Sequence, residues 1–310
     1  MDRFTRLTVA LLVSLAATAA ATYYAGDFEE LGTSARAIGM GGAVVATATG
    51  PAAIYYNPAL ASRQERTSLL FLHSEDFSGL LHHNYLGASF GSRTQSFGFA
   101  VLHNGIPGIK LTTVPDTTRP PGENNRPYVE QVVSANQFVG YVNWSRMLSP
   151  VIAVGANVKL IYQDIGVGSC FGMGVDAGLA VTPMQGLDIG LRARNLSTAP
   201  LFWSNGTRES VTPRLALGID KTFEFGRDAV KLALEVEGIP EEMEFGHSMG
   251  VEYAFRKVLY GRLGLHHGNL CFGLGGRYKR FYVDYGYASG YASGSRELGS
   301  AQQFSGGVEF

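Results

Sequence analysis

Val151–Val181 reads VIAVGANVKLIYQDIGVGSCFGMGVDAGLAV, and two successive runs within it alternate between apolar and small or polar residues. In Ile152–Tyr162 every even-numbered residue is apolar, whereas the odd-numbered ones include Asn157 and Lys159. In Phe171–Val181 the odd-numbered residues are the apolar ones. A period of two over this length predicts two neighbouring β-strands, each with one apolar face.

The same alternation continues through most of the chain from Thr67 onward. Most runs are about as long as the ~9–11 residues with which a β-strand crosses a bilayer, and longer than the ~5–6 residues usual in soluble sheets. We therefore predict an all-β fold of fourteen strands, at 67–73, 82–91, 95–104, 130–145, 150–164, 170–182, 186–196, 211–223, 229–238, 243–256, 257–267, 270–279, 280–288 and 301–310.

Two architectures would give strands with one apolar face, a secreted β-sandwich and a closed membrane barrel. The second face separates them, because in a sandwich it meets bulk water and carries many charged residues. Here it consists mainly of Gly and Ala with scattered charges of both signs, which suits a crowded barrel lumen. The charges are Lys159, Asp176, Asp188, Arg192, Arg194, Arg214, Asp220, Lys231, Glu235, Glu252, Arg262, Arg277 and Asp284.

The connections between the predicted strands alternate in length, as in outer-membrane barrels with short periplasmic turns and longer outer loops. Tight turns follow the even-numbered strands, as at Ser92–Thr94 and Lys279-Arg280. Longer connections follow the odd-numbered strands, with Gly268-Asn269 as a short exception. They are Ser74–Leu81, Gly105–Val129, Ile165–Ser169, Ser197–Ser210, Ile239–Glu242 and Ser289–Ser300. We predict a transmembrane antiparallel β-barrel of about fourteen strands.

Composition agrees with a membrane barrel and excludes other classes. The 310 residues include 40 Gly, 15 Tyr and 18 Phe, and only 16% are charged, against about 25% in soluble domains. With 25 Lys and Arg against 26 Asp and Glu, the net charge is −1, so no basic excess would hold nucleic acid. No motif indicates an enzyme, a cofactor or a metal site. The seven His fall near the longer-loop ends of the strands and suit a membrane interface better than a metal site.

Both ends of the chain carry patterns that predict targeting signals. Arg3 and Arg6 precede an apolar run that ends in an Ala-rich cleavage site, which predicts a signal peptide at 1–21. At the other end, Phe304, Val308 and Phe310 share one face of the last strand. This ending resembles the insertion signal that the barrel-assembly machinery reads in outer-membrane proteins. The expected location is the bacterial cell outer membrane, with its lipid as a partner.

Ser34–Ser62, SARAIGMGGAVVATATGPAAIYYNPALAS, does not continue the alternation. It holds too many Gly for a stable helix, yet it is apolar and would be exposed if it lay in water. Fourteen strands enclose more space than their own side chains fill. We therefore predict that residues 22–66 form a hatch inside the lumen and that residues 67–310 form the barrel.

This stretch and Val151–Val181 resemble the FadL-like outer-membrane barrels, and especially their PorV/PorQ-type relatives. The resemblance consists of a Gly-rich opening, a small-residue stretch and then an Asn-Pro-Ala triplet. It implies that the hatch is a gate, with gate residues Gly39, Gly41, Gly42, Asn57, Pro58 and Ala59.

The resemblance implies passive transport of hydrophobic small molecules, gated by movement of the hatch. The alternatives are a PorV-like accessory of type IX protein secretion, whose partners would be secretion-system proteins, and a structural outer-membrane protein. Transport predicts an apolar pocket for a hydrophobic ligand between the outer loops and the hatch. Gly105–Val129 is the longest loop and the best candidate for contact with a ligand or partner outside.

Overall fold

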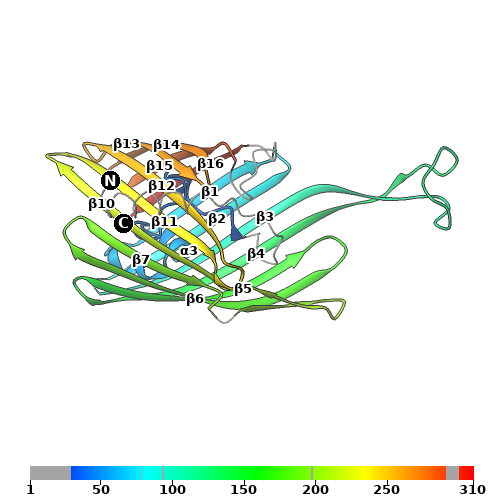
Figure 1. The fold of residues 1–310 in the computed structure, drawn as a ribbon, viewed down its shortest axis with the longest axis horizontal. Coiled ribbons are helices and arrows are strands. Elements are labelled where there is room, and N and C mark those ends of the chain that lie inside the picture. The colour runs from blue at the N-terminus through cyan, green and yellow to red at the C-terminus, as the bar shows by residue number, and fades with distance from the viewer. Residues whose placement is uncertain (1–28, 78, 93, 197, 291–299) are drawn as a thin grey trace, which may run out of the picture.

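The computed structural model describes residues 29–77, 79–92, 94–196, 198–290 and 300–310, and its main body is a closed antiparallel β-barrel (Figure 1). Strands pair in chain order, β7 pairs with β10, and β1 pairs with β16 to close the wall. The predicted signal peptide lies outside the described residues. The fourteen wall strands are β1 (Ser68–Asp76), β2 (Leu81–Gly91), β3 (Gln95–Thr113), β4 (Tyr128–Ser149), β5 (Ile152–Asp164), β6 (Ser169–Met184), β7 (Leu187–Arg194), β10 (Arg214–Phe225), β11 (Asp228–Ile239), β12 (Glu244–Phe255), β13 (Leu259–His266), β14 (Asn269–Tyr278), β15 (Phe281–Ala288) and β16 (Ala301–Glu309).

Each of the fourteen predicted runs corresponds to one wall strand, so the predicted fold class is confirmed. Short turns follow the even-numbered runs at one end of the barrel, which we call the short-turn end. The opposite, long-loop end carries the longer connections, including the single-turn 3₁₀ helix η3 (Pro240–Glu242). No helix among the described residues is both long and apolar enough to span a membrane.

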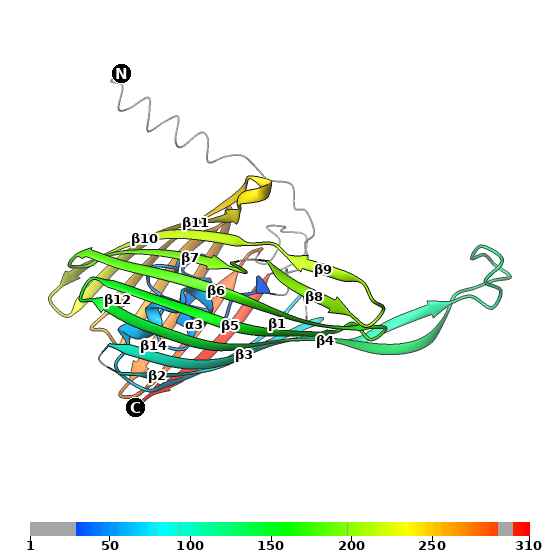
Figure 2. The ribbon, with the colours of Figure 1, turned by 90° about the horizontal axis from the view of Figure 1, so that it is seen from below.

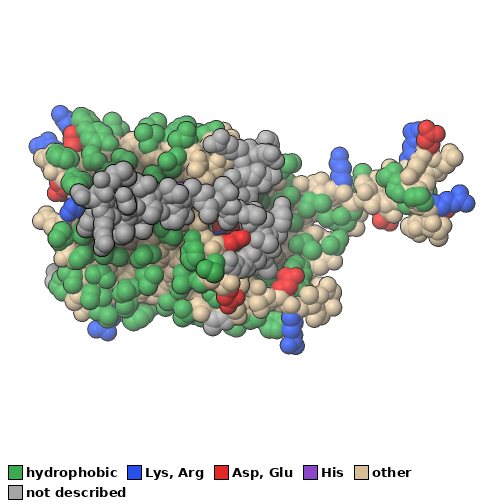
Figure 3. Space-filling model, viewed as in Figure 1, with side chains coloured by type: hydrophobic (Ala, Val, Ile, Leu, Met, Phe, Trp, Pro, Cys, Tyr) green, Lys and Arg blue, Asp and Glu red, His purple; other side chains and the backbone are tan. Residues whose placement is uncertain are grey.

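The two faces of the wall carry the side chains that the alternation assigned to them. The charged residues of the Gly-rich face lie in the lumen, buried or half-buried except for Arg277, and most form ion pairs there. Apolar side chains cover the outer surface (Figure 3). Those that are at least 40% exposed include Phe71, Leu86, Val101, Val142, Leu160, Met173, Leu217, Leu234, Val251, Leu263, Leu274 and Val283. A surface of this kind is stable only against lipid, so the chain is a membrane β-barrel.

The predicted loop Ser197–Ser210 is wrong in part, because it contains two short strands, β8 (Ala199–Trp203) and β9 (Arg208–Val211). β6 pairs with β7 up to Ala177↔Ala193 and then with β8 from Gly172↔Leu201. Between these pairs β6 advances by five residues and its partner by eight, so the partner strand bulges out of register. Because the alternation breaks at this point, the period of two in the sequence did not predict β8.

The predicted loop Gly105–Val129 is also wrong in part, because most of it forms an arm. Pairing of β2 with β3 ends at Gly105, and pairing of β4 with β5 ends at Asn136. β3 and β4 nevertheless pair with each other as far as Thr113↔Tyr128. The resulting two-stranded ribbon projects far beyond the rim of the barrel (Figure 2).

The hatch lies inside the barrel (Figures 1 and 2). Its described part contains the short helices α2 (Ala35–Gly39) and α3 (Ala52–Tyr56) and the 3₁₀ helix η2 (Pro58–Arg63). α2 packs against β13–β16 and η2 against β2–β6, so the segment crosses the lumen. Its apolar side chains are almost fully buried, and the core of the protein is therefore the space between hatch and wall.

Candidate functional site

Glycines of the wall make the seat on which the hatch rests. A Cβ added at any of these positions would come within 3.0 Å of a hatch atom. At Gly264, for example, it would lie 2.2 Å from the backbone nitrogen of Gly41. The lumen face is rich in Gly at these positions because backbone and side-chain atoms of the hatch occupy the volume that wall side chains would take. The glycines are Gly87, Gly98, Gly155, Gly178, Gly190, Gly218, Gly250, Gly264, Gly273 and Gly286.

The predicted gate glycines lie where the chain leaves α2 and reverses. Gly39 sits backbone against backbone on Gly273 of β14. Gly41 (φ 63°) and Gly42 (φ 84°) adopt left-handed conformations that other residues reach only with strain. The Gly41 carbonyl lies 3.1 Å from Nδ1 of His266 in β13. These three glycines therefore fit the hatch to the wall.

Asn57, Pro58 and Ala59 join distant parts of the hatch. Asn57 is fully buried, and its Oδ1 accepts the backbone N–H of Ala59 at 3.1 Å, which caps η2. Its Nδ2 donates to the carbonyl of Val45 at 2.8 Å and to that of Leu179 in β6 at 3.2 Å. Pro58 occupies the first turn of η2, where a missing N–H costs nothing. The triplet thus clamps the two halves of the hatch to one another and to the wall.

Backbone groups of the hatch are bound by wall side chains on other sides as well. The carboxylate of Glu235 in β11 accepts the backbone N–H groups of Val44 and Val45, both at 2.8 Å. Asn157 in β5 donates to the Ile54 carbonyl at 2.7 Å, and Arg192 in β7 donates to the Tyr56 carbonyl at 3.1 Å. These contacts supply the partners that a buried irregular segment needs.

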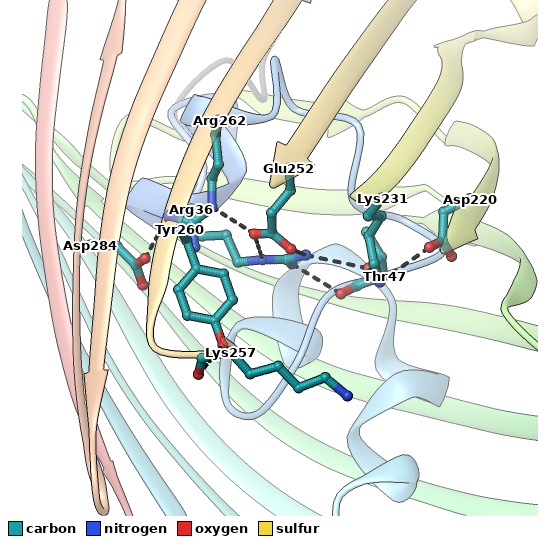
Figure 4. Close-up of polar contacts among 9 residues, drawn as sticks. All are labelled: Arg36, Thr47, Asp220, Lys231, Glu252, Lys257, Tyr260, Arg262 and Asp284. Atoms are coloured by element: carbon teal, nitrogen blue, oxygen red, sulfur yellow. Dashed lines mark hydrogen bonds and ion pairs between the residues drawn. The ribbon is translucent and has the colours of Figure 1, made fainter. Parts of the chain in front are cut away.

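One ion network links the hatch to β12 and β13 (Figure 4). Nε and Nη2 of Arg36 donate to the two oxygens of Glu252 at 2.9 and 3.0 Å, and Nη1 donates to the Thr47 carbonyl at 3.1 Å. Arg262 also donates to Glu252, at 2.6 Å, and to Asp284 at 2.6 Å. Burial lowers the pKa of Arg36, but the Glu252 carboxylate outweighs this effect and raises it overall.

A second ion network holds the start of the described chain nearer the long-loop end. Both oxygens of Glu29 accept from Nζ of Lys159 in β5 at 2.8 Å, and Tyr141 donates to Oε1 at 2.7 Å. Lys159 also lies 3.1 Å from Asp176 in β6. Burial raises the pKa of Glu29, but the cations Lys159 and Arg194 outweigh it, so the pKa lies below its ordinary value. Glu29 is therefore ionised at neutral pH.

A cavity of about 230 Å³ lies beside the first network, toward the short-turn end. Arg36 and Thr47 line it from the hatch, and Lys231 and Tyr260 line it from the wall (Figure 4). Tyr282 of β15 lines it as well. The sequence predicted an apolar pocket between the outer loops and the hatch. This cavity instead lies toward the short-turn end, and its lining mixes charged side chains with apolar ones such as Val44 and Leu70. No group of three or more His, Cys, Asp or Glu within the described ranges has the arrangement of a metal site.

Sequence reasoning missed the charged residues of the hatch that hold it. Arg36 is the one charged residue in Ser34–Ser62. Its position in an otherwise uncharged segment was the feature from which its role could have been predicted. A lone cation in an apolar segment requires an anion wherever the segment is buried. Glu252 is one of the lumen charges that the alternation had already identified.

No protein-family profile and no curated sequence matches the chain. Among solved structures, the toluene transporter TbuX of Ralstonia pickettii is 14% identical with a TM-score of 0.60, over 91% of this chain and 100% of that one. The toluene transporter TodX of Pseudomonas putida is 12% identical with a TM-score of 0.59, over 90% and 98%. A Pseudomonas aeruginosa FadL homologue is 11% identical with a TM-score of 0.51, over 90% and 98%.

The protein is thus a fourteen-stranded membrane β-barrel plugged by its own N-terminal segment. Its fold is that of the FadL-type transporter barrels, as the resemblance in the sequence implied. These similar structures are transporters and channels rather than enzymes. The finer likeness to PorV-type members stays a prediction.

Proposed function

We propose that this protein is an outer-membrane channel for passive entry of hydrophobic small molecules, closed in this conformation by the hatch. One observation carries the proposal: a barrel too wide to be filled by its own side chains is filled by residues 29–66, which are attached by separable side-chain contacts. Proteins of the same fold include TbuX and TodX, described as toluene transporters.

The orientation in the membrane follows from the loops. The short-turn end faces the periplasm, and the long-loop end with the arm faces outward, as in other bacterial barrels. Outer-membrane lipid contacts the apolar surface, and the barrel-assembly machinery reads the last strand. In that strand Phe304 is 59% exposed on the outer face and the terminal Phe310 is 58% exposed, so both side chains are accessible.

Transport requires the hatch to leave its seat at least locally. The hatch also buries larger apolar side chains such as Ile38, Met40 and Ile54, so a local shift costs less than full withdrawal. The polar contacts of Arg36, Asn57 and Glu29 must break in such a shift. Each can break without disturbing the wall, because every wall strand is held by two neighbours.

Solute uptake into proteoliposomes tests this function. We expect toluene and a medium-chain fatty acid to enter faster with the reconstituted protein than without it. Asn57→Asp keeps the acceptor for the Ala59 N–H but removes both Nδ2 donors, and we expect it to raise the rate. Asn205→Asp, in an exposed turn, is the matched control. Equal uptake with Asn57→Asp and the unchanged protein would exclude the hatch as the gate, and no uptake at all would exclude transport.

A second candidate function, accessory of protein secretion, is supported by the arm alone. A two-stranded ribbon outside the membrane offers more surface to a protein partner than to a small molecule. Secretion-system proteins would then be the partners, and deletion of residues 108–131 would impair export of proteins while leaving solute uptake intact.

A further inference from the structure

The cavity of about 230 Å³ beside the first ion network has a lining that combines apolar and polar parts. Val44 of the hatch and Leu70 of β1 give it apolar walls, and the rings of Tyr56, Tyr260 and Tyr282 line it as well. Small-molecule sites combine apolar and aromatic walls with a few polar groups that fix the orientation of the ligand. The cavity therefore has the composition of a binding site for a small molecule.

The size of the cavity limits its ligand to a single ring. An enclosed apolar cavity of about 150 Å³ holds one benzene molecule. A cavity of about 230 Å³ has room for one ring with a small substituent, but not for two rings. Aromatic side chains pack favourably against other aromatic rings, and three tyrosines line this space. The lining thus favours an aromatic ring over an aliphatic one.

The charges around the cavity are already compensated. Each cation among the lining residues lies 2.6–3.1 Å from a carboxylate oxygen. A charged ligand would have to break one of these ion pairs or enter without a counter-ion, and both cost free energy. The ligand that fits is therefore neutral. The pairs are Arg36 with Glu252, Arg262 with Glu252 and Asp284, Arg277 with Glu309, and Lys231 with Asp220.

Lys231 in β11 offers a hydrogen-bond donor to the cavity. Its ammonium group carries three N–H donors. Within the described part of the chain, Nζ donates to Oγ1 of Thr47 at 2.5 Å and lies 3.1 Å from a carboxylate oxygen of Asp220 (Figure 4). These two contacts leave the third N–H for a ligand, and the side chain is 22% exposed where it lines the cavity. A ligand oxygen that accepts this N–H would complete the hydrogen bonding of the group.

We propose that this cavity binds a phenol, a neutral molecule with one aromatic ring and one hydroxyl group. The hydroxyl oxygen would accept a hydrogen bond from Nζ of Lys231, and the ring would pack among Leu70, Tyr260 and Tyr282. A phenol is neutral at pH 7, like the tyrosine side chain, because its pKa is about 10. The inference rests on the proposed function, since it names one class of solute that the channel would pass. In the proposed orientation the cavity lies toward the periplasm.

Fluorine NMR of the full protein in detergent micelles tests the proposal. The probes are 4-fluorophenol, 4-fluorotoluene and 4-fluorobenzoate, and micelles without protein correct for partitioning into detergent. We expect 4-fluorophenol to bind about tenfold more tightly than 4-fluorotoluene, which lacks the hydroxyl group. Unlabelled phenol should displace 4-fluorophenol more strongly than cyclohexanol, which has the hydroxyl group without the aromatic ring. Equal affinity for the phenol and toluene probes, or tighter binding of the benzoate probe, would overturn the proposal.

Two variants show whether binding occurs in this cavity. Lys231→Met combined with Asp220→Asn removes the donor without leaving a buried charge. It should lower the affinity for 4-fluorophenol about tenfold and leave that for 4-fluorotoluene unchanged. Lys221→Met is the matched control, because Lys221 donates to the Gln185 carbonyl and is not among the residues that line the cavity.

The second variant, Ala48→Leu, fills the cavity from the hatch and keeps every ion pair of its lining. It should abolish binding of both neutral probes, and unchanged binding would place the ligand elsewhere and refute the assignment. Amide exchange of residues 35–48 in each variant shows that the hatch is still folded in the lumen.

The binding site and the proposed function can fail separately. Binding in micelles requires no passage across a membrane. Uptake of toluene into proteoliposomes without preferential binding of 4-fluorophenol would refute the phenol site and leave the proposed function intact. Preferential binding of 4-fluorophenol without uptake of any solute would refute the proposed function and leave the site.

Discussion

Replacing Arg36 with methionine should loosen the hatch without disturbing the wall. Methionine keeps most of the side-chain volume but removes four hydrogen bonds, two to Glu252 and two to Thr47, at its carbonyl and its hydroxyl. After the change, Glu252 and Asp284 share Arg262 as their common cation. One carboxylate charge is then left without compensation inside the lumen, and it favours conformations in which water reaches it.

The size of the effect follows from burial. Removing one partner of a fully buried ion pair costs about 3–5 kcal/mol, whereas exposed pairs contribute about 0–1 kcal/mol. The side chains of Arg36 and Glu252 are 16% and 8% exposed, and Arg262 stays in place. We therefore expect about 2 kcal/mol, which is about a thirtyfold rise in the population of displaced hatch.

Two measurements check this value. Initial uptake of toluene into proteoliposomes should rise with the displaced population, and amide exchange of residues 35–48 should accelerate by a similar factor. Arg277→Met is the matched control, because the pair of Arg277 with Glu309 is more exposed and does not involve the hatch. Adding Glu252→Gln to Arg36→Met removes the uncompensated charge and should recover part of the loss.

The reasoning would be refuted by one clear result. If Arg36→Met left both uptake and exchange within about twofold of the unchanged protein, the ion network would not hold the hatch. If exchange accelerated while uptake did not change, the network would hold a hatch that does not gate.

Three further changes have defined outcomes. Gly264→Ala places a methyl group against the hatch backbone and should accelerate hatch exchange, whereas Gly261→Ala, with open space around it, should not. Because Glu29 has a lowered pKa in the folded protein, its stabilisation of the hatch is complete above the ordinary Glu value of ~4.3 and is lost as pH falls through the lowered one; Glu29→Gln should abolish this acid dependence of hatch exchange. Phe310→Ala should reduce the amount of folded barrel in outer membranes, measured by heat-modifiable gel mobility, whereas Phe281→Ala, another exposed aromatic, should leave it unchanged.

The wall could be predicted because its information is local. A side chain of a strand faces lipid or lumen according to its position in a period of two, and the neighbouring strand is set by a short turn. Lys159 and Glu252 were therefore assigned to the lumen from the sequence, and both are buried there. The method failed where the period breaks, as at β8, and where Pro107 and Gly108 indicated a loop although the ladder continues past them.

The contacts between the hatch and the wall could not be predicted from the sequence, because they join residues far apart in the chain. Arg36 meets Glu252 and Glu29 meets Lys159, separations of 216 and 130 residues. The sequence separation of the two residues in each pair does not indicate that they are partners. The glycines of the lumen face predicted close packing, but which part of the hatch each one meets depends on the closed barrel.

The sequence by itself determined fourteen strands, their lipid and lumen faces, and an apolar segment that must be enclosed, because periodicity and polarity act on neighbouring residues. Only the tertiary structure decided which lumen charge holds which part of the hatch, where the cavity lies, and that β3 and β4 continue past the rim as an arm. Those features depend on closure of the barrel, which brings into contact residues that lie far apart in the sequence.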